Sequence, residues 1–307
     1  MKLLFMTDQH LRSASDRPKW RVDDHYKTQF DELNEVVSIA KDQKVDLIIG
    51  GGDLIHHPDI SHTLVSDIMN WSKTLPCAFY TVVGNHCCYA YRIDDLRSSG
   101  LGVLFESGVI NRLDELVFDN DKVVIRGIHA HLNPREGDYG FDGAYYDYTK
   151  IIVSHNFIIP TQVPFDAVLP SQVRTNANII LLGHYHQAFD HMEGSTRFIN
   201  PGSLSRWAIN EQHQPTVLLL DTSTGKITSI QLKGSKPASA IFDLTAASEM
   251  KSQEMNLQDF VASLENTSFD NVDVEQVLLI EGKKQNISQG IIDVAMAKVQ
   301  KAKEELK

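Results

Sequence analysis

The amino-acid sequence predicts an α/β fold in which short buried strands alternate with amphipathic helices. Apolar runs rich in Val and Ile recur along the first two thirds of the chain, and each of them ends in a polar cluster. Stretches with apolar residues at helical spacing lie between the first of these runs. Such alternation is typical of layered α/β proteins, whose functional side chains gather beyond the carboxyl ends of the strands.

Five runs are expected to be strands because they are short, continuous and apolar, as buried strands are. They occupy residues 3–6, 45–49, 78–83, 151–153 and 179–182. Asp, Asn, His and Gly follow them at once, and these residues suit metal binding or close approach of the backbone to a ligand. The strand ends therefore predict where a functional site lies.

Two stretches are expected to be helices that precede the second and third strands. Apolar residues recur at helical spacing over residues 30–40 and again over residues 64–69. Residues 64–75 and 93–105 could cover the sheet or form a dimer face.

The pattern changes near residue 216. Residues 217–220 and 227–232 flank a polar turn and predict a hairpin. A linker follows, so we expect one domain over residues 1–232 and a small α-rich appendage over residues 233–307. An apolar stripe over residues 291–306 makes the appendage a candidate cap or partner-binding region.

The composition restricts the class of protein. The chain has 307 residues, of which 42% are hydrophobic, and no apolar run approaches the length of a membrane span. Three cysteines, two of them adjacent, do not form a disulfide framework, and we expect a cytoplasmic protein. The net charge of −11 disfavours a broad basic surface for nucleic acid, but not an enzyme that meets DNA through bound metal or a partner.

The strand ends carry a pattern that predicts a two-metal site. Asp8 and His10 are spaced two apart, as are His184 and His186, so each pair can point to one side of an extended segment. Asp53 follows three glycines and could bridge two ions. Two divalent ions would clamp a phosphate and activate a water molecule. His86 could then protonate the leaving oxygen.

Each of these motifs alone has a plainer interpretation. An isolated Asp-x-His is usually a surface turn, and Gly-Asn-His is commonly a turn with a capping Asn. The occurrence of all the motifs in order, each at a strand end, favours the metal site.

The motifs taken together resemble those of the calcineurin-like metallophosphoesterase superfamily. The matching motifs are Asp8-x-His10, Gly52-Asp53, Gly84-Asn85-His86, His155 and Gly183-His184-x-His186. The resemblance implies a β-sandwich flanked by helices, an α/β fold of four layers, with two metal ions. It implies Asp8, His10, Asp53 and His186 as ligands of one ion. It implies Asp53, Asn85, His155 and His184 as ligands of the other.

Within that superfamily the chain is most similar to the SbcD-type nuclease subunit of DNA-repair complexes. The similarity rests on His56 in Asp53-Leu54-Ile55-His56, on the segment from Asn200 to Arg206 before the hairpin, and on the C-terminal appendage. It implies a manganese-dependent DNA exonuclease and endonuclease, with Mg²⁺, Fe²⁺ or Zn²⁺ as other candidate ions. It also implies a homodimer that works with an SbcC-type coiled-coil ATPase. The compact length is similar to the shortened versions that large phages encode.

The sequence departs from the family pattern at one position and leaves several roles open. Cys87 stands where the family usually has an Asp that supports the catalytic His86. Arg206 could bind substrate or make a structural contact. His129 and His131 are expected at a loop or rim, and His25 at the surface. The alternatives are a stand-alone phosphodiesterase or phosphatase, and a weakly active scaffold subunit.

Overall fold

The computed structural model describes residues 1–137, 139–163 and 167–245. Residues 1–242 form one compact unit, and the expected appendage lies almost wholly outside the described residues. The domain boundary at residue 232 therefore stays a prediction.

The first sheet is built around the N-terminal strand and has the order β12-β11-β1-β2-β3-β4. Its strands are β1 (Lys2–Met6), β2 (Leu47–Gly50), β3 (Phe79–Thr81), β4 (Asn111–Arg112), β11 (Thr216–Asp221) and β12 (Lys226–Gln231). Strands β1 to β4 are parallel, with Leu3 opposite Leu47 and Met6 opposite Gly50. The hairpin predicted after residue 216 is confirmed as β11 and β12, and it adds to the sheet antiparallel to β1.

The second sheet has the order β5-β6-β7-β8-β10-β9. Its strands are β5 (Glu115–Phe118), β6 (Val123–Ile128), β7 (Thr149–Ser154), β8 (Ile179–Leu182), β9 (Phe189–Glu193) and β10 (Thr196–Asn200). Its four central strands, β6, β7, β8 and β10, are parallel, whereas the two edge strands are antiparallel to their neighbours.

The two sheets pack face to face through one apolar layer. Phe5 and Ile49 of the first sheet belong to the same buried cluster as Ile151, Val153 and Leu181 of the second. Burial of these continuous apolar strands on both faces explains why their sequences do not alternate with polar residues.

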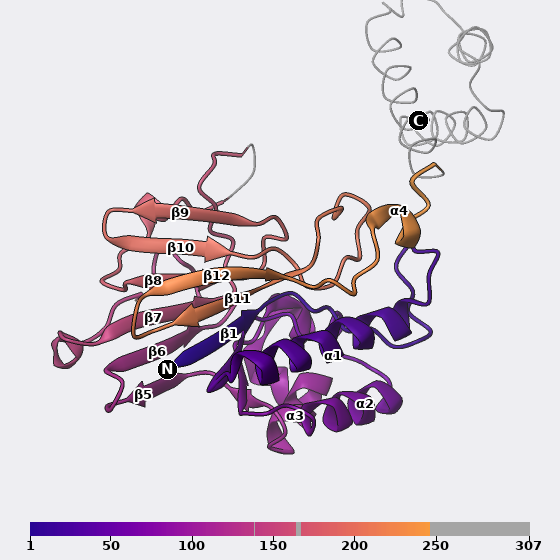
Figure 1. Cartoon of the computed structure of the whole chain (residues 1–307), viewed down its shortest axis with the longest axis horizontal. Coiled ribbons are helices and arrows are strands. Elements are labelled where there is room, and N and C mark those ends of the chain that lie inside the picture. Colours follow the sequence, from indigo (N-terminus) through magenta and orange to yellow (C-terminus); the bar gives the residue numbers. More distant parts are fainter. Residues whose placement is uncertain (138, 164–166, 246–307) are drawn as a thin grey trace, which may run out of the picture. The chain divides into compact units, whose positions relative to one another are not determined.

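Helices cover the outer face of the first sheet (Figure 1). They are α1 (His25–Gln43), α2 (His62–Ser72) and α3 (Gly100–Glu106), and a short helix α4 (Ala238–Ile241) follows the hairpin. Leu33 of α1 and Ile68 of α2 pack with Ile48 of β2 in a second core cluster. The side chains of Asp24 and Ser61 cap the N-termini of α1 and α2. The helices predicted before the second and third strands are thus confirmed.

The outer face of the second sheet is covered by loops and 3₁₀ turns in the described residues. Among the described residues, Gly143–Tyr145 and Pro170–Gln172 are 3₁₀ turns that follow β6 and β7, whereas the 3₁₀ turns Asn85–Cys87, Tyr89–Tyr91 and Ile93–Ser98 follow β3 of the first sheet. Tyr139, Phe141 and Ile158 supply a third apolar cluster there. The result is a β-sandwich with α-helices on one side and loops on the other. No helix of the described part of the chain has the length and hydropathy needed to cross a membrane.

Candidate active site

The carboxyl ends of strands from both sheets meet at one edge of the sandwich. The loops after β1, β2 and β3 come from the first sheet, and the loops after β7 and β8 come from the second. Together they bring six of the seven predicted ligand side chains into two neighbouring groups. The ligand atoms of each group lie within 4.8 Å of one another, and the groups are Asp8, His10 and His186, and Asp53, His155 and His184.

Asp53 belongs to the second group and also approaches the first. Its Oδ2 atom is 3.0 Å from Nε2 of His155 and 3.8 Å from Nε2 of His10. Asn85 joins the second group, because its Oδ1 atom is 3.1 Å from Nε2 of His155 and 2.8 Å from Nδ1 of His184. The Asp53 carboxylate therefore lies near ligand atoms of both groups.

The backbone at these strand ends is strained. Asp8, His10, Asp53 and His184 have φ between 43° and 72°, in the left-handed region that non-glycine residues seldom adopt. Backbone strain of this kind costs about 1–3 kcal/mol at each residue and gathers at functional sites. Hydrogen bonds keep the backbone in this conformation. One of them runs from the backbone N–H of His10 to the carbonyl of Asp53, at 2.8 Å.

Gly52 and Gly84 let the ligand loops approach each other. A Cβ atom at Gly52, whose φ is 101°, would lie 2.3 Å from the ring of His155. One at Gly84 would lie 2.1 Å from Oδ1 of Asp53. The glycines of the two motifs are thus required by close packing around the site.

Hydrogen bonds fix the two carboxylates. Thr7 Oγ1 donates to Asp8 at 2.7 Å, and the backbone N–H of His184 donates to the same carboxylate at 3.1 Å. The backbone N–H of His86 donates to Asp53 at 2.9 Å. Donors of this kind orient ligands around a metal.

The electrostatics of the cluster favour a cation. Burial alone would raise the pKa of Asp8, but the hydrogen bond and charges of neighbouring histidines lower this pKa to about 2. Burial would lower the pKa of His155, but the Asp53 carboxylate outweighs it and raises the pKa to about 9. Two buried carboxylates, an amide oxygen and imidazoles form a donor set that suits Mn²⁺, Fe²⁺ or Zn²⁺.

His56 and His86 lie together beside His10. Their rings stack at a centroid distance of 4.6 Å, and the ring of His86 is 4.8 Å from that of His10. Burial and the guanidinium of Arg12 lower the pKa of His56 to about 2, so its ring is neutral. Nη2 of Arg12 lies 2.5 Å from Nε2 of His56, which places a positive charge on this side of the cluster.

Although Cys87 stands where the family usually has an Asp, the ring of His86 still has a hydrogen-bond acceptor, which is a backbone carbonyl. Nδ1–H of His86 donates to the carbonyl of His56 at 2.9 Å. The Cys87 thiol is fully buried, and burial together with Asp53 raises its pKa, so that it stays neutral. The carbonyl of His56 can thus fix the His86 ring without the Asp that the family usually has.

The side chain of Arg206 is buried and paired within the protein. Its side chain is 1% exposed, donates to the carbonyls of Lys236 and His213, and lies 3.6 Å from Glu32. These contacts favour the structural alternative for Arg206. The predicted substrate-binding role has no supporting contact in the described residues.

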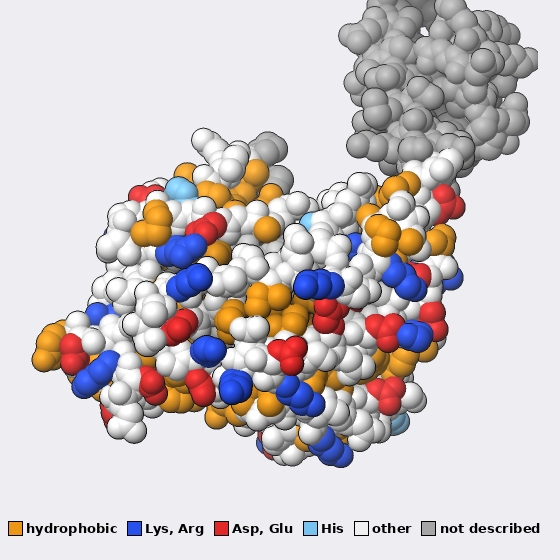
Figure 2. All heavy atoms as spheres, in the orientation of Figure 1, with side chains coloured by type: hydrophobic (Ala, Val, Ile, Leu, Met, Phe, Trp, Pro, Cys, Tyr) orange, Lys and Arg blue, Asp and Glu red, His pale blue; other side chains and the backbone are white. Residues whose placement is uncertain are grey.

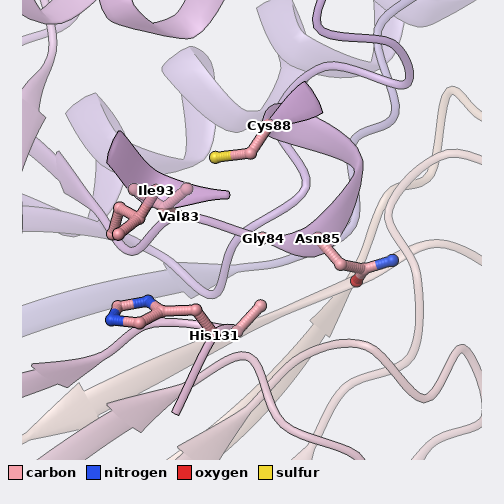
Figure 3. A pocket seen from close by; sticks show the side chains of 7 residues that line it. Val83, Gly84, Asn85, Cys88, Ile93 and His131 are labelled. Atoms are coloured by element: carbon pink, nitrogen blue, oxygen red, sulfur yellow. The ribbon is translucent and has the colours of Figure 1, made fainter. Parts of the chain in front are cut away.

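The other histidines have separate places. His129 accepts the backbone N–H of Val83 at 3.0 Å and faces Asp114, so it supports a strand end. His131 and Cys88 line a cavity of about 10 Å³ beside Asn85. The side chain of Asn85, a predicted ligand, is directed away from Cys88 (Figure 3). The prediction that His25 lies at the surface is wrong: it is 5% exposed, because the segment containing Arg12 folds over the first turns of α1.

The sequence patterns did not predict that Arg12 and Glu211 contribute to the site. Glu211 is 2% exposed, hydrogen-bonds to Nδ1 of His186 and accepts the backbone N–H of Trp207 at 2.6 Å. It lies in a polar segment with no motif to distinguish it. Trp207 faces the cluster, with its ring 5.0 Å from that of His56.

The profile of the calcineurin-like phosphoesterase superfamily domain matches residues 1–225. The chain belongs to this superfamily. Its two mixed sheets with flanking helices are the superfamily's fold, and membership implies a metal-dependent hydrolase that uses divalent ions.

Individual relatives are distant. The chain is 24% identical to double-strand break repair protein MRE11 of Encephalitozoon cuniculi over a match that covers 72% of this chain and 45% of that protein. The chain thus spans less than half the length of this curated relative. Among solved structures it is similar to a dimetal phosphatase from Danio rerio, with 13% identity, a TM-score of 0.49, and coverage of 76% of this chain and 99% of that one. It is also similar to an archaeal phosphodiesterase, with 16% identity, a TM-score of 0.40, and coverage of 75% and 99%.

Proposed function

We propose that the chain is a two-metal phosphodiesterase that cleaves DNA as the nuclease subunit of an SbcCD-type repair complex. The observation that carries the phosphodiesterase proposal is that the Asp53 carboxylate belongs to one group of ligand atoms and lies 3.8 Å from Nε2 of His10 in the other. Asp8, His10, Asp53 and His186 would hold one ion, and Asp53, Asn85, His155 and His184 the other. Mn²⁺ is the proposed native ion.

The residues around the ions would have different roles in phosphodiester hydrolysis. Two divalent ions, when bound, supply the charge that holds the scissile phosphate and activates the attacking water. His86, with Nδ1–H donated to the carbonyl of His56, would act in its doubly protonated form: it would give the Nε2 proton to the leaving oxygen and keep the proton on Nδ1. Arg12 and His56 would face a phosphate oxygen on that side.

Asn85 lines two separate cavities, and this favours an extended substrate. One of about 250 Å³ is lined by His56, His86 and Tyr89, and another of about 340 Å³ by His155, Phe157 and Arg135. Because Asn85 lines both, a chain could pass across the ligand cluster from one cavity to the other. The partial match to a double-strand break repair protein makes DNA the preferred chain.

DNA binding is proposed to need partners. The chain carries a net charge of −11, and Lys and Arg alternate with Asp and Glu on the face shown in Figure 2. A surface of this kind attracts phosphates weakly at physiological salt. We therefore include in the proposal an SbcC-type ATPase partner, a homodimer and a cytoplasmic location.

A stand-alone phosphodiesterase or phosphatase is the second candidate, and the same negative charge favours it. A scaffold role has less support, because His86 retains a hydrogen-bond acceptor despite Cys87.

The assay that separates these functions uses purified protein with Mn²⁺. Its substrates are linear duplex DNA, single-stranded DNA and bis(4-nitrophenyl) phosphate, with and without the ATPase, beside an Asp53→Asn variant. We expect cleavage of DNA that the ATPase stimulates and that Asp53→Asn abolishes. Hydrolysis of the small diester but of neither DNA, even with the ATPase, would contradict the nuclease proposal.

A further inference from the structure

We propose that Glu211 is a positioning residue that fixes the orientation and tautomer of His186 and makes one metal position tighter than the other. This inference rests on the ligand set proposed above.

The contacts of Glu211 hold its carboxylate in one place. One oxygen hydrogen-bonds to Nδ1 of His186. The other accepts the backbone N–H groups of Trp207 at 2.6 Å and Ala208 at 3.0 Å. With three donors around a carboxylate that is 2% exposed, Glu211 has no freedom to turn away from His186.

These contacts decide which nitrogen of His186 is available. An ionised carboxylate only accepts hydrogen bonds, so Nδ1 of His186 carries the proton that faces Glu211. When the ring binds an ion, its lone pair is then on Nε2, which lies 3.0 Å from Nε2 of His10 and 3.5 Å from Oδ1 of Asp8. A carboxylate behind a histidine in this way makes the ring a stronger ligand.

In the second group of ligands, the histidine His155 has a neutral acceptor behind it instead of a carboxylate. Nδ1–H of His155 donates to the carbonyl of Gly51 at 2.7 Å, which is a neutral acceptor. The carboxylate of Glu211 adds a negative charge to the first group only. The two metal positions should therefore differ in affinity.

The loop that carries Glu211 is attached to the ligand loops themselves. The backbone N–H of Leu204 donates to the carbonyl of Thr7 at 2.9 Å, and that of Ser203 donates to the carbonyl of His186 at 3.2 Å. The position of Glu211 is thus set relative to the residues it serves.

Glu211→Gln tests this role without changing the size of the side chain. Glutamine has one acceptor oxygen, so it cannot serve both His186 and the backbone N–H groups. The matched control is Glu193→Gln, because Glu193 also pairs with a histidine, His191 at 3.4 Å, but at the exposed edge of β9. Mn²⁺ binding to metal-free protein is measured by titration calorimetry without nucleic acid.

We expect two binding events in the unaltered protein. Glu211→Gln should weaken one of them about 10–100-fold and leave the other unchanged. Glu193→Gln should change neither. Two unaltered events in Glu211→Gln would overturn the inference while leaving the proposed function intact, whereas an unaltered protein that binds no Mn²⁺ would contradict both.

A second measurement needs no variant. In ¹⁵N-histidine NMR spectra of the Zn²⁺-loaded protein, His186 should bind the ion through Nε2 and keep its proton on Nδ1. Binding through Nδ1 would overturn the inference even if Glu211→Gln does not fold.

Discussion

Nε2 of His155 lies 3.0 Å from Oδ2 of Asp53, although the two residues come from different sheets of the sandwich. Asp53 follows β2 and His155 follows β7, so this contact forms only when the two sheets pack face to face. The metal site therefore depends on the apolar layer between the sheets, and loss of that packing would separate its ligands.

Asp53→Asn should lose most of the activity, because the amide cannot supply a negative charge to both ions. A loss of about 3 kcal/mol of transition-state stabilisation corresponds to a fall of about 100-fold in kcat. The measurement is the rate on bis(4-nitrophenyl) phosphate at saturating Mn²⁺. Asp221→Asn, at the end of β11 that pairs with Lys2, is the control, and equal loss in both variants would contradict the assignment.

His86→Gln should slow hydrolysis by about 100-fold or more if the ring protonates the leaving oxygen. The loss should be larger for DNA, whose leaving alkoxide needs a proton, than for a 4-nitrophenyl ester, whose leaving group does not. Metal binding should be unaffected. Equal losses on the two substrates would show that His86 acts in another way.

Gly52→Ala should displace His155 and weaken metal binding. The added Cβ would lie 2.3 Å from the His155 ring, in addition to the strain of a positive φ. Gly108→Ala is the control for strain alone, since Gly108 has φ of 71° and nothing within 4 Å of an added Cβ. Comparable metal affinities in the two variants would argue against this close packing.

His25 should make the protein sensitive to acid. Burial and the neighbouring Arg21 lower its pKa from 6.5 to about 3, and both ring nitrogens are buried without a hydrogen-bond partner in the described residues. As the pH falls, His25 therefore takes up a proton at a higher pH in the unfolded chain than in the folded protein. The contribution of His25 to stability is present above pH 6.5 and is lost as the pH falls toward 3, by up to about 1.4 kcal/mol per pH unit.

His25→Leu is expected to remove this part of the pH dependence. The free energy of unfolding of metal-free protein is measured by urea titration between pH 7 and pH 4. His62→Leu is the control, because His62 is exposed at the start of α2. A slope that is the same for His25→Leu and the unaltered protein would contradict the prediction.

The sequence was sufficient to predict the fold class and the gathering of ligands, for a specific physical reason. Runs such as residues 179–182 are buried on both faces, so their continuous apolar character distinguishes them as strands. Parallel strands end at the same edge, and the ligands follow those ends directly. That His10 and Asp53, which follow the parallel neighbours β1 and β2, lie close together thus follows from local patterns.

The remaining elements depend on tertiary contacts that carry no local signal. β9 is largely polar and forms only by pairing with β10, and β4 has two residues. Glu211 and Arg12 reach the site because loops fold back onto it. The wrong expectation for His25 has the same cause, since it is a loop that buries this helix end.

The central claim is that the strand-end side chains hold two ions that share Asp53. The most direct measurement is a crystal structure of Mn²⁺-loaded protein with anomalous diffraction at the manganese edge. We expect two anomalous peaks, one beside His10 and His186, the other beside His155 and His184, with the Asp53 carboxylate bound to both. A single peak, or peaks away from Asp53, would contradict the account.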